Sequence, residues 1–141
     1  MILLDTNVVS ELMRPEPTAA VLDWVDGRNP TALFLSAISE AELRAGVAML
    51  PQGRRRDRLL AAVEAVIEHD FMGRLLPFDS RSARSYAEIF AARRAVGRPI
   101  LEADCQIAAI AACHGMAVAT RNVADFIDCG IEVIDPWRQP V

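Results

Sequence analysis

Four carboxylates stand where a predicted strand gives way to a loop or a helix. Asp5 directly follows the apolar run Ile2–Leu4, and Asp125 follows a later apolar run through a short polar loop. Glu42 and Asp104 lie in the first turns of predicted helices. Ligand sites of parallel α/β sheets lie at the carboxyl ends of the strands, where the following helices begin. We therefore expect the four acids to lie close together at one edge of a sheet.

Each of these acids, taken alone, also fits a purely structural role. Asp5 could cap a helix, and Asp125 could cap a single turn. Ser39 and Glu42 have the spacing of a capping box, and Asp104 could complement the positive end of a helix dipole. Taken together, four partly buried acids would repel one another by several kcal/mol. A divalent cation would remove that repulsion, and oxygen-only ligands favour Mg²⁺ or Mn²⁺.

Carboxylate-bound Mg²⁺ or Mn²⁺ most often serves phosphoryl chemistry. The metal lowers the pKa of a bound water, orients it, and neutralises charge on the scissile phosphate. The sequence contains no P-loop, no Gly-rich nucleotide cradle and no G-x-S-x-G elbow. This pattern favours a hydrolase that cuts a phosphodiester without a covalent intermediate.

Several polar residues near these acids could support such a site. Asn7, Ser39, Thr120 and Asn122 could orient the carboxylates or a water molecule, and they could equally be turn and cap residues. Arg121 could bind a substrate phosphate through two N–H groups, or it could pair with one of the acids.

The chain contains Arg and no Lys. Besides Arg121, two groups of Arg residues could contact nucleic acid. The strongest run is Arg54 to Arg58, which could contact an RNA backbone or form a solvated helix face. Arg93, Arg94 and Arg98 allow the same two interpretations.

Composition predicts one globular domain over residues 1–141, because 52% of the residues are hydrophobic and 24% are charged. The net charge of −4 disfavours non-specific binding to nucleic acid unless the Arg residues gather in patches. We expect a cytoplasmic protein without a membrane partner, because no apolar stretch reaches membrane-spanning length and the first residues do not have the pattern of a secretory leader. Cys105, Cys113 and Cys129 lack C-x-x-C spacing, which favours buried free thiols.

The predicted elements alternate between short apolar strands and amphipathic helices. The predicted strands are residues 2–4, 33–35, 75–76, 116–119 and 131–134, and the predicted helices are residues 6–13, 18–26, 39–49, 54–68, 80–96 and 102–114. Strands separated by helices favour parallel pairing with right-handed crossovers. We therefore predict a three-layer α/β/α domain with a five-stranded parallel sheet.

Four segments resemble the signatures of PIN-domain ribonucleases, in order and across essentially the whole chain. They are Leu3-Leu-Asp-Thr-Asn7, Ser36-x-x-Ser-x-x-Glu42-Leu, Ala103-Asp-x-x-Ile-Ala108 and Thr120-Arg-Asn-x-x-Asp125-Phe. Further segments resemble the VapC/FitB-type toxins of bacterial toxin–antitoxin modules. These are Val9-Ser-Glu11, Glu42-Leu-Arg-x-Gly46, Gly73-Arg-x-Leu-Pro-Phe-Asp79, Gly97-Arg-Pro-Ile100 and Asp135-Pro-Trp137.

The resemblance implies a PIN-like fold and a Mg²⁺- or Mn²⁺-dependent endoribonuclease that cuts structured RNA such as tRNA or rRNA. It implies an acidic pocket in which Asp5 and Asp104 are the primary metal ligands and Glu42 and Asp125 complete the site. It also implies a homodimer and inhibition by a small cognate antitoxin of the VapB/FitA kind. The toxin would then contact operator DNA only through this antitoxin. Glu102 stands where the family commonly has a small residue, and its helical offset from Asp104 predicts that it faces solvent.

Two alternatives remain at this point. The chain could be a PIN nuclease of RNA processing or of DNA, unconnected with toxicity. It could instead be a binding module that mainly joins an antitoxin and represses its own operon. The apolar positions Leu43 and Val47, together with the helix over residues 54–68, could receive an antitoxin helix or could be core.

Overall fold

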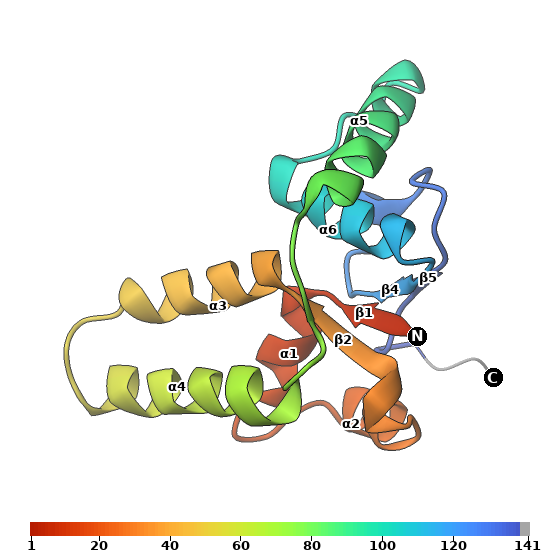
Figure 1. Cartoon of the computed structure of the whole chain (residues 1–141). Helices are drawn as coiled ribbons and strands as arrows, with labels where there is room; N and C mark the ends of the chain where they lie inside the picture. The colour runs from red at the N-terminus through yellow and green to blue at the C-terminus, as the bar shows by residue number, and fades with distance from the viewer. Residues whose placement is uncertain (139–141) are drawn as a thin grey trace.

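A five-stranded parallel sheet with helices on both faces forms the centre of the computed structural model, which describes residues 1–138 (Figure 1). The strand order is β3-β2-β1-β4-β5. The strands are β1 (Ile2–Leu4), β2 (Leu33–Ser36), β3 (Leu75–Leu76), β4 (Ala117–Ala119) and β5 (Val133–Ile134). The predicted fold class is therefore confirmed, whereas the predicted domain end at Val141 lies outside the described residues.

Six α-helices connect and cover the strands. They are α1 (Thr6–Leu12), α2 (Ala19–Asp26), α3 (Ala37–Ala48), α4 (Arg54–Ala65), α5 (Ser80–Ala95) and α6 (Glu102–Cys113), with the short helices η1 (Pro30–Ala32), η2 (Val66–Asp70) and η3 (Val123–Phe126). The predicted helix over residues 54–68 is divided, because its last turns widen into the π-helix η2. No helix within residues 1–138 is both long enough and apolar enough to cross a membrane.

The period-two alternation of strand side chains divides the core into two parts. Leu3 and Val118 point to one face, where they pack with α5 and α6. Leu4 and Ala119 point to the other face, where α1, α2, α3 and α4 supply the partners. Each strand is apolar on both faces because both faces are covered, as expected for a parallel sheet.

The pairing register brings the carboxyl ends of the three central strands level with one another. Leu4 of β1 pairs with Leu35 of β2 on one side and with Ala119 of β4 on the other. The residues that follow these positions are therefore neighbours at one edge of the sheet. Asp5, Ser36 and Thr120 occupy this edge, where the sequence pattern predicted a site.

The start of α3 differs from the prediction. Ser36, not Ser39, is the N-cap, because its buried hydroxyl oxygen accepts the Ser39 N–H at 3.0 Å. The helix begins at Ala37, so the predicted start at Ser39 and the predicted place of Glu42 in the first turn are wrong, and the capping-box alternative for Ser39 and Glu42 does not apply. Two serines three residues apart can each cap a helix. Here Ser36 ends β2 and accepts the Ser39 N–H, whereas the Ser39 hydroxyl lies against Thr6.

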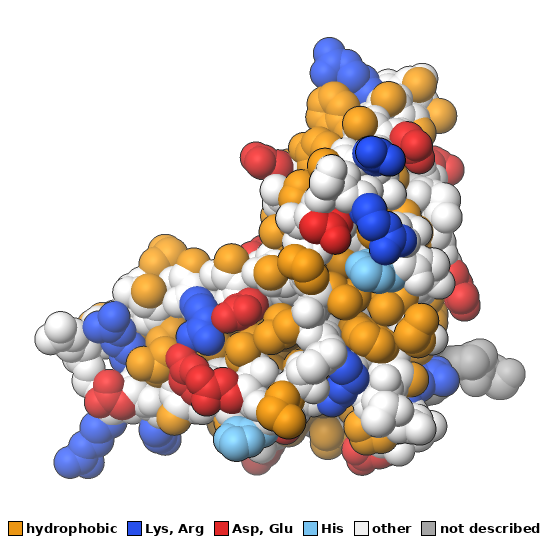
Figure 2. Space-filling model, in the orientation of Figure 1, with side chains coloured by type: hydrophobic (Ala, Val, Ile, Leu, Met, Phe, Trp, Pro, Cys, Tyr) orange, Lys and Arg blue, Asp and Glu red, His pale blue; other side chains and the backbone are white. Residues whose placement is uncertain are grey.

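Two pairs of helices extend away from the sheet in different directions (Figure 1). The α3–α4 pair forms one arm, and α5, packed on α6, forms the other. On the face shown in Figure 2, hydrophobic side chains gather around the junction of the arms, and charged side chains are scattered along them. The acidic edge of the sheet lies near the starts of α3 and α6, one helix from each arm.

Candidate active site

Asp5 is the most deeply buried acid at the edge of the sheet, with only 5% of its surface exposed. It is also the N-cap of α1, since its Oδ1 accepts the Thr6 N–H at 2.8 Å. Its Oδ2 accepts the buried Thr120 hydroxyl at 2.8 Å and the Asn7 Nδ2 at 3.3 Å. The cap role and the site role therefore coincide in one side chain, whose orientation is fixed by three donors.

Asn7 and Thr120 connect the start of α1 to the segment after β4. Asn7 Nδ2 lies 3.3 Å from Thr120 Oγ1, and Asn7 Oδ1 accepts the backbone N–H of Arg121 at 3.3 Å. The Thr120 hydroxyl oxygen also accepts the Asn122 N–H at 3.0 Å. These bonds position the two edge segments relative to each other.

A hydroxyl relay joins the start of α1 to α3. Thr6 Oγ1 lies 2.8 Å from Ser39 Oγ and 2.8 Å from Glu42 Oε1. Ser39 is fully buried, whereas Glu42 is exposed. The relay orients the Glu42 carboxylate toward the sheet edge although the side chain is open to solvent.

Asp5, Glu42 and Asp104 line one pocket of about 520 Å³. They come from β1, α3 and α6, three segments far apart in the sequence. The remaining lining residues are Thr6, Asn7, Ser10, Glu11, Arg14, Arg121, Asn122 and Trp137. Three of the four predicted acids thus share a single cavity.

Asp125 lies beside this pocket and does not line it. Its side chain is exposed on η3, where its N–H donates to the Asn122 carbonyl at 3.0 Å. Its charge nevertheless reaches the other acids, because it raises the pKa of both Asp5 and Asp104. Asn122 is likewise exposed, at the mouth of the pocket.

The electrostatics of the pocket disfavour full ionisation. Burial raises the pKa of Asp104 to about 6, and the charges of Asp5, Asp125 and Glu42 add to the shift. Burial likewise raises the pKa of Asp5, against hydrogen bonds from Thr120 and Thr6 that lower it. Carboxylates with raised pKa values in a shared cavity are typical of functional sites.

The chemistry of these donors suits a hard divalent cation. The acids offer only oxygen ligands, and a cation would offset the mutual repulsion that raises their pKa values. Within residues 1–138, no three His, Cys, Asp or Glu side chains stand in a ready metal-coordinating arrangement. The oxygen ligands therefore suit a hard divalent cation such as Mg²⁺ or Mn²⁺, although their side chains are not already arranged around a metal position.

Comparison with known proteins identifies the fold around this pocket. The sequence model of the PIN domain family matches residues 2–128. The chain belongs to the PIN domain family. The four acids, the Asn7 contact and the Thr120 contact all fall within the matched residues.

Curated relatives match this PIN domain over nearly their whole length. It is 48% identical to the plasmid stability protein StbB of Pseudomonas syringae, 46% to the VapC ribonuclease Y4jK of Sinorhizobium fredii and 44% to the toxin FitB of Neisseria gonorrhoeae. Each match covers 98% of this chain and 99% of the relative. The resemblance to VapC/FitB-type toxins is therefore confirmed.

A solved structure extends this similarity to three dimensions. A chain in the structure of FitAB bound to the IR36 DNA fragment superposes with a TM-score of 0.94 at 42% identity. The match covers 100% of this PIN domain and 99% of that chain.

Arg121 and Trp137 line the same pocket as three of the four acids. The Arg121 guanidinium lies over the Trp137 ring, 5.3 Å from the ring centroid, and the Arg121 side chain is exposed. Such a cation–π contact uses the face of the guanidinium, so its in-plane N–H groups can still donate to a phosphate. None of the ion pairs within residues 1–138 joins Arg121 to a pocket acid.

Five residues that line the pocket of this PIN domain were not predicted as site residues, and Thr6 and Glu11 have the most contacts among them. Thr6 carries the relay to Ser39 and Glu42, and its only sequence signal is its place directly after Asp5. Glu11 is 6% exposed and accepts hydrogen bonds from Arg14 and from the backbone and hydroxyl of Thr18, which hold its pKa below the usual range. Glu11 thereby ties the end of α1 to the start of α2 at the rim of the pocket.

The remaining predictions about individual side chains have clear outcomes. Glu102 is exposed, as its helical offset indicated. All three cysteines are free thiols, with Cys105 and Cys129 buried and Cys113 partly buried. Arg93 is 5% exposed, so its assignment to a basic surface group was wrong.

Proposed function

We propose that this PIN domain is the toxin of a type II toxin–antitoxin module and acts as a Mg²⁺- or Mn²⁺-dependent endoribonuclease. The observation that carries the proposal is the shared pocket of Asp5, Glu42 and Asp104, three carboxylates delivered by separate elements to one edge of the sheet. The names of the relatives agree, since one is a VapC ribonuclease and another is a toxin.

In this proposal Asp5 and Asp104 bind the metal directly. Both oxygens of Asp5 already accept hydrogen bonds, yet Oδ1 has a single partner and keeps a lone pair for a cation. Glu42, oriented by Thr6, and Asp125, beside the pocket, complete the ligand set directly or through water. A bound Mg²⁺ or Mn²⁺ would supply an activated water and neutralise charge on the scissile phosphate.

The substrate in this proposal is a structured RNA such as tRNA or rRNA. The exposed Arg121 guanidinium over Trp137 would bind a backbone phosphate at the mouth of the pocket. Asn7, Ser39, Thr120 and Asn122 would hold the carboxylates and the edge segments in place, as their contacts indicate.

A cognate antitoxin is the proposed protein partner, and the toxin is proposed to form a homodimer. A groove of about 650 Å³ lies between α1, α3 and α4, lined by apolar residues such as Leu43 and Val47 and bordered by Arg55 and Arg58. An amphipathic segment of the antitoxin would fit such a groove. Operator DNA would be reached through the antitoxin, consistent with the DNA-bound FitAB structure.

Induced expression in bacteria tests the proposal. Expression of the PIN domain should stop growth, and mapping of RNA ends soon after induction should show new cuts at defined sites. Asp5→Asn should restore growth and abolish the cuts, with Glu102→Gln, an exposed acid beside Asp104, as the matched control that stays toxic.

The same experiment separates the two alternatives. Growth arrest without new RNA ends would contradict the ribonuclease. Asp5→Asn protein that still arrests growth would support a binding module instead, because neutralising one carboxylate should leave the α3–α4 groove intact.

A further inference from the structure

Arg93 on α5 is buried within the fold, with 5% of its surface exposed. Its Nη1 donates to the backbone carbonyls of Asp125 at 2.7 Å and Ile127 at 3.0 Å, and lies 3.6 Å from Cys129 Sγ. Its Nε donates to the carbonyl of Arg98 at 2.7 Å. One guanidinium therefore bonds to two chain segments that are remote from each other in sequence.

Both of these segments lead to proposed site acids. The Arg98 carbonyl belongs to the turn between α5 and α6, and α6 carries Asp104 in its first turn. This turn has a defined shape, because Gly97 adopts a φ of +72° and the Arg98 N–H donates to the Arg93 carbonyl at 2.9 Å. The Asp125 carbonyl belongs to η3, which carries the fourth acid.

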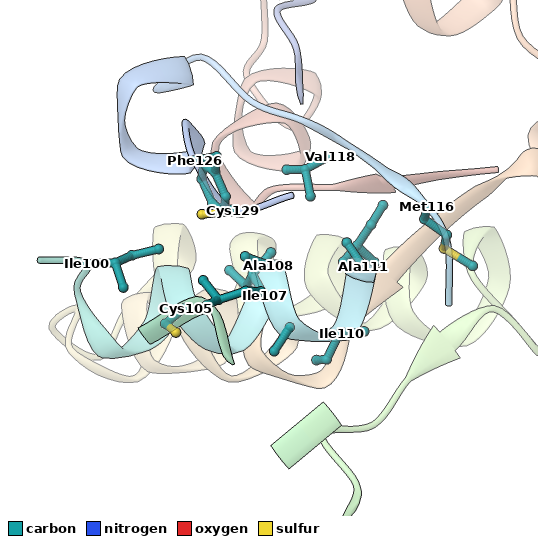
Figure 3. Packing of buried hydrophobic residues seen from close by; sticks show 13 residues of the cluster. Ile100, Cys105, Ile107, Ala108, Ile110, Ala111, Met116, Val118, Phe126 and Cys129 are labelled. Atoms are coloured by element: carbon teal, nitrogen blue, oxygen red, sulfur yellow. The ribbon is translucent and has the colours of Figure 1, made fainter. Parts of the chain in front are cut away.

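The segment from Asp125 to Cys129 is otherwise attached by two apolar anchors. Phe126 is 1% exposed and Cys129 is 6% exposed, and Figure 3 shows both side chains packed together over α6. These anchors hold the segment to the core without fixing the direction in which the exposed Asp125 side chain points. The Arg93 bonds to the carbonyls of residues 125 and 127 supply that restraint on the backbone.

The charge of Arg93 is unusual for so buried a position. Within residues 1–138, no carboxylate forms an ion pair with it. A buried guanidinium satisfied only by neutral groups is costly, because charge in a low-dielectric interior needs compensation. The hydrogen bonds to the carbonyls of Arg98, Asp125 and Ile127 therefore hold the guanidinium in this position.

We propose that Arg93 is a positioning residue of the acidic pocket: its guanidinium clamps η3 to the α5–α6 turn, and this clamp fixes the backbone that holds Asp125 beside the pocket. This inference rests on the proposed function, because it concerns the same metal pocket. It assigns a role at the site to a side chain that touches neither the pocket nor the substrate.

Mn²⁺ titration calorimetry of the purified chain tests this role without relying on activity. Arg93→Lys keeps the charge and loses the planar fork, and Arg93→Gln keeps a planar amide donor and loses the charge. Both should raise the dissociation constant for Mn²⁺ by about 10-fold or more, the usual effect of losing a group that orients a metal ligand. In RNA cleavage, both should lower kcat and leave KM nearly unchanged, because Arg93 does not face the substrate.

Two control variants separate positioning from loss of stability. Arg94→Lys makes the same change at the exposed neighbouring position of α5. Ile89→Val trims a residue of α5 that is 5% exposed, which lowers stability and removes none of the Arg93 hydrogen bonds. Both controls should retain the wild-type affinity for Mn²⁺, with circular dichroism used to choose a temperature at which every variant is folded.

A double-mutant cycle tests whether Arg93 acts through Asp125. Asp125→Asn should weaken Mn²⁺ binding, and Arg93→Lys in the Asp125→Asn background should weaken it little further, because the two changes remove one effect. Equal weakening by Arg93→Lys in both backgrounds would overturn the clamp, as would wild-type affinity in Arg93→Lys and Arg93→Gln. If the unmodified chain failed to bind Mn²⁺, the proposed function and this inference would both fall.

Discussion

Neutralising Asp104 should stabilise the metal-free domain while abolishing cleavage. The folded protein raises the pKa of this carboxyl from 3.8 to about 6, because burial and then the charges of Asp5, Asp125 and Glu42 disfavour the ionised form. At neutral pH the ionised Asp104 carboxylate is therefore less favourable in the folded protein than in the unfolded chain, which lowers the free energy of unfolding. Asp104→Asn removes this charge and keeps the shape of the side chain.

The size of the effect follows from the shift. Each pKa unit corresponds to about 1.4 kcal/mol, so the shift sets an upper bound of about 3 kcal/mol. Asp104 is partly accessible to solvent, which screens the repulsion and reduces the expected gain to about 1–2 kcal/mol. For a chain of this length, such a gain raises Tm by roughly 3–6 °C.

The sign of the pH dependence is fixed by the direction of the shift. A carboxyl whose pKa is raised on folding destabilises the fold only when it is ionised. The penalty is therefore absent below the unfolded pKa of 3.8, grows as the pH rises toward 6, and is complete above it. The stability advantage of Asp104→Asn should appear across the same window.

Thermal and urea unfolding in EDTA between pH 4 and pH 8 measure the difference. Glu102→Gln is the matched control, since it neutralises an exposed acid in the same turn of α6 and should change stability by less than about 0.5 kcal/mol. Added Mn²⁺ should stabilise the unmodified chain more than the Asp104→Asn variant. An Asp104→Asn protein no more stable than the unmodified chain at pH 8 would refute the argument that the acids repel one another.

Two further perturbations address the neighbours of the acids. Thr120→Val removes the hydroxyl that donates to Asp5 Oδ2 at 2.8 Å. It should cost about 1–3 kcal/mol of stability by urea unfolding, because a buried acceptor loses its partner. Since that hydrogen bond lowers the pKa of Asp5, its loss should move the acid limb of the pH–rate profile to higher pH, and an unmoved limb would contradict this role. Arg121→Ala should raise KM for RNA and leave kcat largely intact, because the exposed guanidinium stands at the mouth of the pocket. A fall in kcat with KM unchanged would argue against a phosphate-binding role.

The sequence predicted those parts of the fold that depend on local pattern. The apolar run that stops at Asp5 marks β1 and the edge of the sheet, and the Gly97 signal correctly ended α5 near its last turn. Strand register then brought Asp5 and Thr120 together without further information, because both directly follow paired strand ends. Such features could be predicted since each depends on residues next to one another in the chain.

The features that sequence reasoning missed depend on contacts between distant segments. Ser36 and Ser39 are equivalent as capping residues until β2 is seen to end at Ser36 and the Ser39 hydroxyl to contact Thr6. Thr6 gains its role only when α3 is packed beside β1, which places Glu42 within reach of its hydroxyl. Arg93 resembles a surface residue in an Arg-rich helix end, and only the packing of η3 against α5 gives its guanidinium buried carbonyl partners.

Titration of purified, folded protein with Mn²⁺, followed by incubation with RNA, tests the central claim most directly. The unmodified chain should bind Mn²⁺ and cut RNA, and EDTA should stop the cutting. Asp5→Asn should fold, bind Mn²⁺ much more weakly and leave the RNA intact. Full metal affinity and full cleavage by a folded Asp5→Asn protein would contradict the assignment of this pocket as a metal-dependent ribonuclease site.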